Sequence, residues 1–463
     1  METSARPLLF VAMPIGVKPD PKHRERIDFD RIYRDAIKPA GERAGVQVIR
    51  ADEETVGGII HLSIYERLLL AEIVVADLTL GNPNVFYELG VRHSARPKST
   101  ILIYAKQQDL PFDVAMVRAI PYSLQGGALM PQEASRLTGV LTERLFDAIA
   151  ESAQTDSPLF QLVHSYPGIA LPHEYAESFK ERVRYARAIR ERIEEARRSR
   201  DDASALREID ELVRPMPLPE LERHDLLVAV LLAYRDLKAY DRVIELAAQV
   251  VSEDRCPPVV QEQYAFSLNR RNRPGDRALA LRVLRGVIDR HGESPETYGL
   301  MGSVHKDAYL ECVAAGTGST AQAHLDEAIA CYRHGFESDP RDYYPGINAA
   351  TLLFAKGDAA ALAELQDLLP VVVFSVGRRG GLQSHDYWDI ATVLEASVLG
   401  GDWATAGRAS ARLATLEAPR WQYQTTASNL TLIRRSREAR GLNCDDLQCV
   451  LATIQECAQA SRR

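Results

Sequence analysis

Two carboxylates stand on either side of a turn in residues 76–93, ADLTLGNPNVFYELGVRH. Asp77 ends an apolar run, and Glu88 lies in a helical pattern that opens after Gly-Asn-Pro-Asn. Cleavage of a glycosidic C–N bond puts positive charge on the ribose, and a carboxylate beside the anomeric carbon stabilises that charge. In this interpretation Glu88 is the catalytic group, kept ionised because the first turns of a helix lower the pKa of an acid. Asp77 would hold the ribose hydroxyls.

Each carboxylate also has a structural explanation. Glu88 and Arg92 have the i,i+4 spacing of an ion pair, in the order that stabilises a helix by ~0.2–0.5 kcal/mol. Asp77 can cap the turn that ends its strand. The sequence does not decide between the catalytic and the structural interpretations, so both stay open.

Four segments follow the strands of the expected sheet, at residues 13–20, 50–57, 77–84 and 105–112. Ligands of a parallel sheet bind beyond the carboxyl ends of its strands. Free backbone amides there could receive phosphate oxygens, and a cation could add charge. The candidate substrate-binding residues are Met13, Pro14, Arg50, Asp52, Asn82 and Asn84, and no metal site is expected. The alternatives are a helix N-cap at Asn84, turn chemistry at Asn82 and a solvated charge at Asp52.

Strand and helix patterns alternate through residues 1–151. Continuous apolar runs predict buried strands at Leu8–Ala12, Val46–Ile49, Ile73–Ala76, Thr100–Tyr104 and Ala119–Tyr122. Helical patterns lie between the strands, and a last helix is predicted over Pro131–Glu151. This strict alternation predicts an α/β domain over 1–151, with a parallel sheet covered by helices on both faces.

Strand patterns almost vanish in residues 173–463. Residues 152–172 carry Ser and Pro without periodicity and are interpreted as a linker. Helices then come in pairs, for example at Ala203–Val213, Leu221–Leu237, Tyr240–Ser252, Val259–Asn269 and Arg277–Arg290. The spacing of prolines 258, 295 and 340 approaches a period of about 34 residues if roughly ten residues near 314–320 are an insert. This predicts an all-α tetratricopeptide-like solenoid over 173–463, which would bind a protein partner. A non-repetitive helical bundle is the alternative.

The composition of the chain narrows its partners. The 463 residues carry a net charge of −8, which disfavours nucleic acids and anionic membranes. The six cysteines form no CxxC pair and no zinc-ligand spacing with histidine, as is typical of reduced thiols in a cytoplasmic protein. We find no apolar stretch of 18 residues, so we expect no membrane span and a cytoplasmic location.

Three stretches of the helical half resemble a known regulatory region. They are Gly381–Thr392 (GLQSHDYWDIAT), Leu399–Trp403 (LGGDW) and Trp421–Leu430 (WQYQTTASNL). They are similar to the TRAF-binding region of the apoptosis signal-regulating kinases, and the resemblance spans most of residues 160–440. Bacteria carry kinase-less relatives of that region, and this chain has no kinase motif. The resemblance implies regulation by protein contact.

Residues 7–122 resemble the nucleoside 2-deoxyribosyltransferase and TIR-like superfamily of flavodoxin-like domains. The matching pieces are FVAMP at 10–14, Arg50–Asp52, Ala76-Asp77 and Asn84–Gly90, where the Glu-Leu-Gly resembles the segment that carries the nucleophilic glutamate of the transferases. By this resemblance Glu88 is the catalytic candidate and Asp77 the carboxylate on the sugar side. The transferases usually place an acid about six positions before that glutamate, whereas this chain has Asn82.

Two functions follow as hypotheses. The first is an enzyme that cleaves or transfers at the N-glycosidic bond of a nucleotide, with NAD as the first guess for the substrate, no other cofactor, and regulation through the helical repeats in bacterial stress or antiphage signalling. The alternative is a non-catalytic signalling adaptor that binds a nucleotide ligand or associates with itself. In either case we expect a homo-oligomer.

Overall fold

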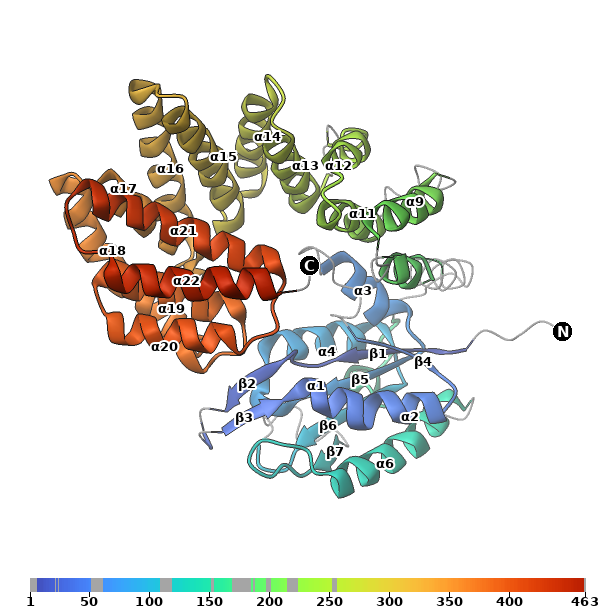
Figure 1. Ribbon diagram of the computed structural model, residues 1–463. Helices are drawn as coiled ribbons and strands as arrows, with labels where there is room; N and C mark the ends of the chain where they lie inside the picture. The colour runs from blue at the N-terminus through green and yellow to red at the C-terminus, as the bar shows by residue number, and fades with distance from the viewer. Residues whose placement is uncertain are drawn as a thin grey trace. The chain divides into compact units, whose positions relative to one another are not determined.

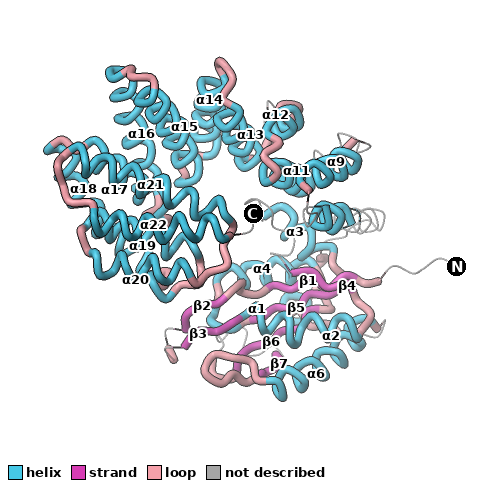
Figure 2. The backbone as a smooth tube through the Cα atoms, viewed as in Figure 1, coloured by secondary structure: helices cyan, strands magenta, loops and turns pink. Residues whose placement is uncertain are grey.

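The computed structural model describes residues 6–20, 22–23, 25–50, 61–108, 119–150, 154–168, 185, 188–196, 201–214, 224–251 and 256–461. The chain divides into two compact units, Met1–Ala233 and Tyr234–Arg463. The first contains the parallel sheet and the second consists of helices (Figures 1 and 2). Each unit is described by itself.

A five-stranded parallel sheet forms the centre of the first unit. Its strands are β1 (Leu8–Ala12), β4 (Gln47–Arg50), β5 (Ile73–Asp77), β6 (Thr100–Ala105) and β7 (Ala119–Tyr122). They lie in the order β4-β1-β5-β6-β7 and every neighbouring pair is parallel. This is the 2-1-3-4-5 order of doubly wound, flavodoxin-like sheets. The five strands predicted from apolar runs are therefore confirmed.

The buried strand residues alternate between two hydrophobic cores. Leu9 and Val11 of β1 pack with α1 (Phe29–Ile32), a π-helical turn (Tyr33–Ile37), α2 (Lys38–Arg43) and α6 (Pro131–Ile149). Leu8 and Phe10 pack on the opposite face, with α3 (His61–Leu70) and α4 (Pro83–Ala95). Because successive side chains of a strand point to opposite faces, one continuous apolar run supplies both cores.

A short antiparallel hairpin, β2 (Val17–Asp20) and β3 (Glu25–Asp28), follows β1. From its sequence this segment is expected to be a ligand-binding loop, not a pair of strands. The two strands carry mostly exposed residues, so they lack the apolar run that marks the sheet.

The described part of the predicted linker, residues 154–168, packs on the first unit. Short helix α7 (Pro158–Leu162) contacts α4. The Asp156 carboxylate accepts a hydrogen bond from the Thr100 amide at 2.8 Å, and the Ser157 hydroxyl donates to the His93 carbonyl at 2.7 Å. These contacts hold the segment against the start of β6 and the last turn of α4.

Helices account for the rest of the described chain. After a helical stretch at residues 188–196, these helices are α9 (Asp202–Val213), α11 (His224–Asp236), α12 (Tyr240–Ala247), α13 (Pro258–Arg271) and α14 (Asp276–His291). They correspond to the five helices predicted in this part. The later ones are α15 (Pro295–Ala314), α16 (Gly318–Ser338), α17 (Tyr343–Lys356), α18 (Ala359–Arg378), α19 (Tyr387–Gly400), α20 (Trp403–Ala414), α21 (Arg420–Ala439) and α22 (Asp445–Ala460).

The insert predicted near residues 314–320 is wrong. Helix α15 runs to Ala314 and α16 starts at Gly318, so the extra residues lengthen the two helices to 20 and 21 residues. Small residues do mark their close approach, as expected. A Cβ atom at Gly302 of α15 would lie 2.8 Å from the ring of Tyr332 on α16, so only glycine fits there.

Helix α18 corrects a second expectation, the absence of any long apolar stretch. An 18-residue stretch within Ala359–Gln383 has a mean hydropathy of 1.6, and the helix is long and apolar enough to cross a membrane by length and composition. Only 28% of this stretch is buried inside the protein. Several apolar side chains of α18 therefore lie on the surface of the protein.

Candidate functional site

Asp77 is held inside the protein by neighbouring side chains. It is fully buried at the end of β5. Its carboxylate accepts hydrogen bonds from the backbone amide and the hydroxyl of Thr79, at 3.0 and 2.6 Å, and from the Tyr122 hydroxyl at 2.8 Å. The Thr79 hydroxyl also accepts from the Ala105 amide at 2.9 Å. Asp77 thus ties together the ends of β5, β6 and β7, and the turn-capping interpretation holds.

Burial raises the pKa of Asp77 to about 6, although the hydrogen bonds from Thr79 and Tyr122 act in the opposite direction. The side chain of Asp77 has no solvent exposure, and both of its oxygens accept hydrogen bonds from the protein itself, so neither oxygen faces an open cavity. The expectation that Asp77 and Glu88 face one ligand cavity therefore has no support at Asp77.

Glu88 lies half-buried in the second turn of α4. Burial raises its pKa to about 7. The expected lowering by the helix N-terminus is wrong because the loss of solvent outweighs the helix dipole, whose effect fades within the first turn. At neutral pH a large fraction of this carboxyl is protonated.

The expected Glu88–Arg92 ion pair is also wrong. Arg92 is fully buried, and its guanidinium points to the ends of neighbouring elements. It donates to the carbonyls of Leu68, Ala71, Glu72 and Ser99 at 2.8–3.3 Å and to the Thr100 hydroxyl at 3.4 Å. The helix position suggested a surface pair, but Arg92 links the end of α3 to the start of β6.

The candidate anion site near Arg50 is closed by an acidic side chain. Arg50 is buried at the end of β4, lies 2.9 Å from the Asp30 carboxylate and stacks 4.5 Å from the centroid of the Tyr33 ring. The same Asp30 oxygen accepts the Gly16 amide at 3.0 Å, just after Met13 and Pro14, which are both buried. The predicted residues Met13, Pro14 and Arg50 do come together at the sheet edge. The Asp30 carboxylate pairs with the charge of Arg50 and accepts the Gly16 amide.

The residue roles at the start of α4 differ from the prediction. Asn82 is the N-cap, and its side-chain oxygen accepts the amides of Asn84 and Val85 at 2.9 and 3.4 Å. Asn84 is an exposed residue inside the first turn. The N-cap expected at Asn84 and the free amide expected there are therefore both wrong, because Pro83 starts the helix one residue after Asn82. Asp52 lies outside the described residues.

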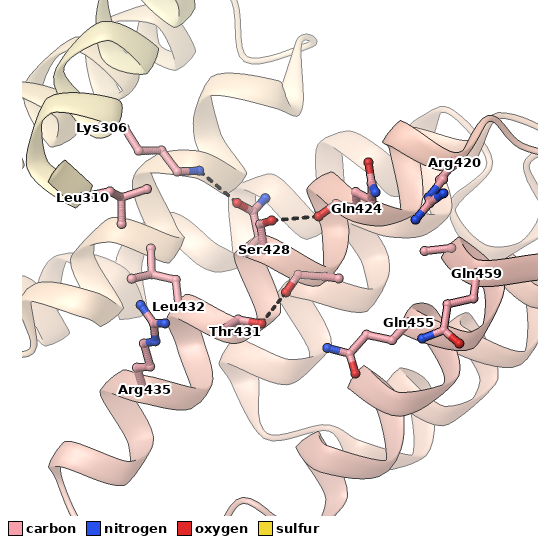
Figure 3. A pocket seen from close by; sticks show the side chains of 13 residues that line it. Lys306, Leu310, Arg420, Gln424, Ser428, Thr431, Leu432, Arg435, Gln455 and Gln459 are labelled. Atoms are coloured by element: carbon pink, nitrogen blue, oxygen red, sulfur yellow. Dashed lines mark hydrogen bonds between the residues drawn. The ribbon is translucent and has the colours of Figure 1, made fainter. Parts of the chain in front are cut away.

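A groove on the surface of the second unit is another candidate binding site. It has a volume of about 780 Å³ and lies on α15, α21 and α22 (Figure 3). Along α21 most of its lining follows one helix face, with residues at i, i+4, i+7, i+8, i+11, i+12 and i+15 from Arg420, and Asn429 joins them at i+9. The polar members are Arg420, Gln424, Ser428, Asn429, Thr431 and Arg435 of α21, Lys306 of α15, and Gln455 and Gln459 of α22. We call this the α21 groove.

Positive charge dominates the α21 groove. Its lining residues include three cations and no acid. Arg420 and Arg435 are exposed and make no ion pair or hydrogen bond with any residue that the structure describes. Figure 3 places them at opposite ends of the groove. Two guanidinium groups are thus open to a ligand.

Lys306 is the third cation, and a buried polar chain holds it. Its ammonium donates to the side-chain oxygens of Asn348 and Asn429 at 3.0 and 2.9 Å. Asn429 in turn donates to both carboxylate oxygens of Glu395, at 3.1 and 3.2 Å. Burial lowers the pKa of Lys306 and raises that of Glu395 to about 7. The amide of Asn429 therefore separates the two charges and fixes Lys306 at the groove.

The α21 groove was not predicted from the sequence. A signal was present, because the polar residues of α21 recur at helical spacing on one face. The contribution of Lys306 could not be read this way, since it lies 123 residues from Asn429. In the residues that the structure describes, no group of His, Cys, Asp and Glu has the arrangement of a metal site.

Comparison with known proteins identifies the family. The sequence profile of the MAP3K TRAFs-binding domain matches residues 85–449, more than three quarters of the chain. The chain belongs to the MAP3K TRAFs-binding domain family. The resemblance of the helical half to this region is therefore confirmed, and the match begins already inside α4, three residues before Glu88.

The curated relatives are protein kinases that are much longer than this chain. Mitogen-activated protein kinase kinase kinase 6 of Homo sapiens is 29% identical over 79% of the chain and 29% of the kinase. Mitogen-activated protein kinase kinase kinase 5 of Homo sapiens is 26% identical over 85% of the chain and 30% of the kinase. The nsy-1 kinase of Caenorhabditis elegans is 33% identical over 49% of the chain. The chain thus spans less than a third of the length of these relatives.

These matches correct the enzymatic hypothesis. Residues 1–151 are about a third of the chain, so a match that covers 85% of it includes part of the sheet domain. The sheet and the helices together resemble a kinase regulatory region, not a helical region joined to a glycosidase. N-glycosidic cleavage is therefore the wrong reading, and the signalling adaptor is the better one.

Proposed function

We propose that the chain is a regulatory scaffold of a signalling system and that it binds an acidic, extended segment of a protein partner in the α21 groove. The observation that carries this proposal is the pair of unpaired guanidinium groups, Arg420 and Arg435, in a groove whose lining has no acid. Membership of a TRAFs-binding family supports a protein as the ligand.

The length of the groove favours an extended chain over a small anion. Arg420 and Arg435 are fifteen residues apart on α21, which corresponds to about 22 Å at the helical rise of ~1.5 Å per residue. One phosphate or carboxylate cannot bridge that distance. An extended peptide advances ~3.3 Å per residue, so about seven residues span the groove.

The side chains between the two arginines suit a peptide backbone. Gln424, Gln455 and Gln459 supply amide donors and acceptors. Lys306 lies beside Asn429, about 13 Å along α21 from Arg420 and about 9 Å from Arg435. Acidic residues three to four positions apart in an extended chain would therefore meet successive cations. The forked guanidinium groups can pair with carboxylates through two hydrogen bonds.

A fluorescence anisotropy titration tests this proposal. The probe is a fluorescein-labelled peptide of about ten residues that alternates glutamate and serine, so its carboxylates repeat every ~7 Å. Its control replaces glutamate by glutamine. We expect the full chain to bind the acidic peptide and not the control. Arg420→Gln and Arg435→Gln should each weaken binding about tenfold, the equivalent of one charge-assisted hydrogen bond. Arg282→Gln removes an exposed arginine outside the groove and should change nothing.

Three outcomes would overturn the proposal. The first is equal binding by the wild type and both groove variants. The second is binding of the glutamine peptide with the same affinity. The third is tighter binding of an oligodeoxythymidine than of the acidic peptide, which would make nucleic acid the better ligand.

The helical pairs support a further part of the proposal, a tetratricopeptide-like arrangement. Helices α13 and α14, α15 and α16, and α17 and α18 pack as successive neighbours. Connections such as residues 315–317 are short, as antiparallel pairs require. The nucleotide ligand and the cytoplasmic location stay predictions.

A further inference from the structure

Helix α18 carries an exposed stripe that is complementary to itself. Asp367, Val371, Phe374 and Arg378 have the i, i+4, i+7, i+11 spacing of one helix face. All four are exposed, with Val371 at 44% and Phe374 at 68%. The opposite face, with residues such as Leu365 and Val372, is buried. We call the four residues the α18 stripe.

Its two charges are unpaired, unlike their neighbours. Glu364, earlier on α18, lies 3.3 Å from Arg333, and Arg379 donates to Asp389 at 3.0 Å. Asp367 and Arg378 make no ion pair with the described part of the chain. The helix therefore presents an acid and a base, about 16 Å apart, at the two ends of an apolar pair.

We propose that the α18 stripe is the contact between two copies of this chain. The midpoint between Asp367 and Arg378 coincides with the midpoint between Val371 and Phe374. A two-fold axis through that point sets two α18 helices antiparallel. Asp367 then faces Arg378 of the second copy twice, and Val371 faces Phe374 twice. Such isologous contacts are the usual basis of homodimers.

The flanking residues allow this approach. Beside the stripe, Pro370 is exposed and short and Gly377 is exposed and has no side chain, and Val373 adds apolar surface with 50% exposure. Packed helices lie 8–10 Å apart in general, which brings the end charges of antiparallel helices within ion-pair reach. One helix pair buries less surface than a standard interface, so the dimer is weak, with a dissociation constant in the micromolar range or above.

A charge exchange measured by sedimentation velocity tests the geometry. The full chain is run at about 5 to 500 μM, to cover the range expected for a small interface. We expect a dimer fraction that rises with concentration. Asp367→Arg or Arg378→Asp alone should raise the dissociation constant at least tenfold, because each places two like-charged pairs in the contact. The double variant should recover the wild-type value within about threefold, the scatter expected for exposed pairs. Phe374→Ser should abolish the dimer.

Glu143→Arg is the control, since it reverses an exposed acid on α6 and should leave the dimer unchanged. A wild type that stays monomeric throughout, or a double variant that stays dissociated, would overturn the proposal. Binding of the monomer to phosphatidylcholine vesicles through Phe374 would also overturn it and assign the stripe to a lipid surface.

The dimer goes beyond the proposed partner site and can fail separately. Binding of the acidic peptide is tested with variants of Arg420 and Arg435, whereas dimer formation is tested with variants of Asp367 and Arg378. A monomeric chain that still binds the peptide would end only the dimer.

Discussion

The sheet edge and the α21 groove both collect polar side chains, but they use them differently. At the sheet edge, Asp77 and Arg50 are hydrogen-bonded or ion-paired inside the protein. In the groove, Arg420 and Arg435 have no partner among the residues that the structure describes. Residue type and position at a strand end suggested a site there. The hydrogen bonds and ion pairs instead show that the polar groups at the strand ends already have partners, whereas the two arginines of the groove do not. The polar groups at the sheet edge stabilise the fold, whereas we propose that those of the α21 groove bind a ligand.

The largest expected effect comes from Arg92. Arg92→Leu leaves several buried carbonyls without their donor, so the first unit should lose about 3–5 kcal/mol of stability. Thermal unfolding followed by circular dichroism should show a transition lowered by roughly 10 °C. Arg144→Gln, an exposed change on α6, is the control. An unchanged transition for Arg92→Leu would mean that this anchor contributes nothing to the fold.

Asp77 should have the second largest effect. Asp77→Ala removes the acceptor of three hydrogen bonds and should cost about 2–4 kcal/mol, whereas Asp77→Asn keeps the shape and should cost less. A ligand-binding carboxylate would show the reverse pattern, with little loss of stability on removal.

Because the pKa of Asp77 is raised in the folded state, the stability of the first unit should depend on pH. The folded value of about 6 lies above the ordinary 3.8, so the folded state keeps a proton that the unfolded chain releases. The contribution of Asp77 is full below pH 4 and is lost as the pH rises to 6, by about 2–3 kcal/mol. Urea unfolding of Asp77→Asn at pH 4.5 and 6.5 should show a smaller decline than the wild type. An equal decline in both proteins would contradict the raised pKa.

In the α21 groove, substitutions of Lys306 and Arg420 should change the stability of the second unit by smaller and unequal amounts. Lys306→Met leaves the oxygens of Asn348 and Asn429 without a donor and should destabilise the second unit by about 1–2 kcal/mol. Arg420→Gln should stay within about 0.5 kcal/mol, because Arg420 is exposed and unpaired. Thermal unfolding of the two variants makes the measurement. Equal losses would show that Arg420 serves the fold as well.

The smallest effect on stability is expected on α18. Phe374→Ser replaces an exposed ring, so the unfolding transition should move by less than about 0.5 kcal/mol while the dimer is lost. Calorimetry at a low and a high protein concentration separates the two effects. A large destabilisation at both concentrations would mean that Phe374 packs within its own chain.

Much of the fold could be predicted because its signals are local. Each buried strand is a short apolar run, and most helix bounds follow from periodicity and Gly or Pro stops. The β2–β3 hairpin was missed because its residues are polar and exposed. The insert near 314–320 was wrong because a proline spacing cannot distinguish a loop from two longer helices.

The site was harder to predict because its contacts are long-range. Tyr122, which donates to Asp77, lies 45 residues further along the chain, so the sequence left the role of Asp77 open. Arg92 has helix spacing with Glu88, yet its acceptors lie at the ends of other elements. Pattern reasoning locates charged residues, but it does not show which of them the fold has already paired.

The most direct test of this comparison is a parallel titration of the alternating glutamate–serine peptide against two variants. Arg420→Gln combined with Arg435→Gln should weaken binding about a hundredfold, since sites this far apart contribute additively. Glu88→Gln should bind as the wild type does. Binding that survives the double arginine change and is lost with Glu88→Gln would place the site at the sheet edge and contradict the account.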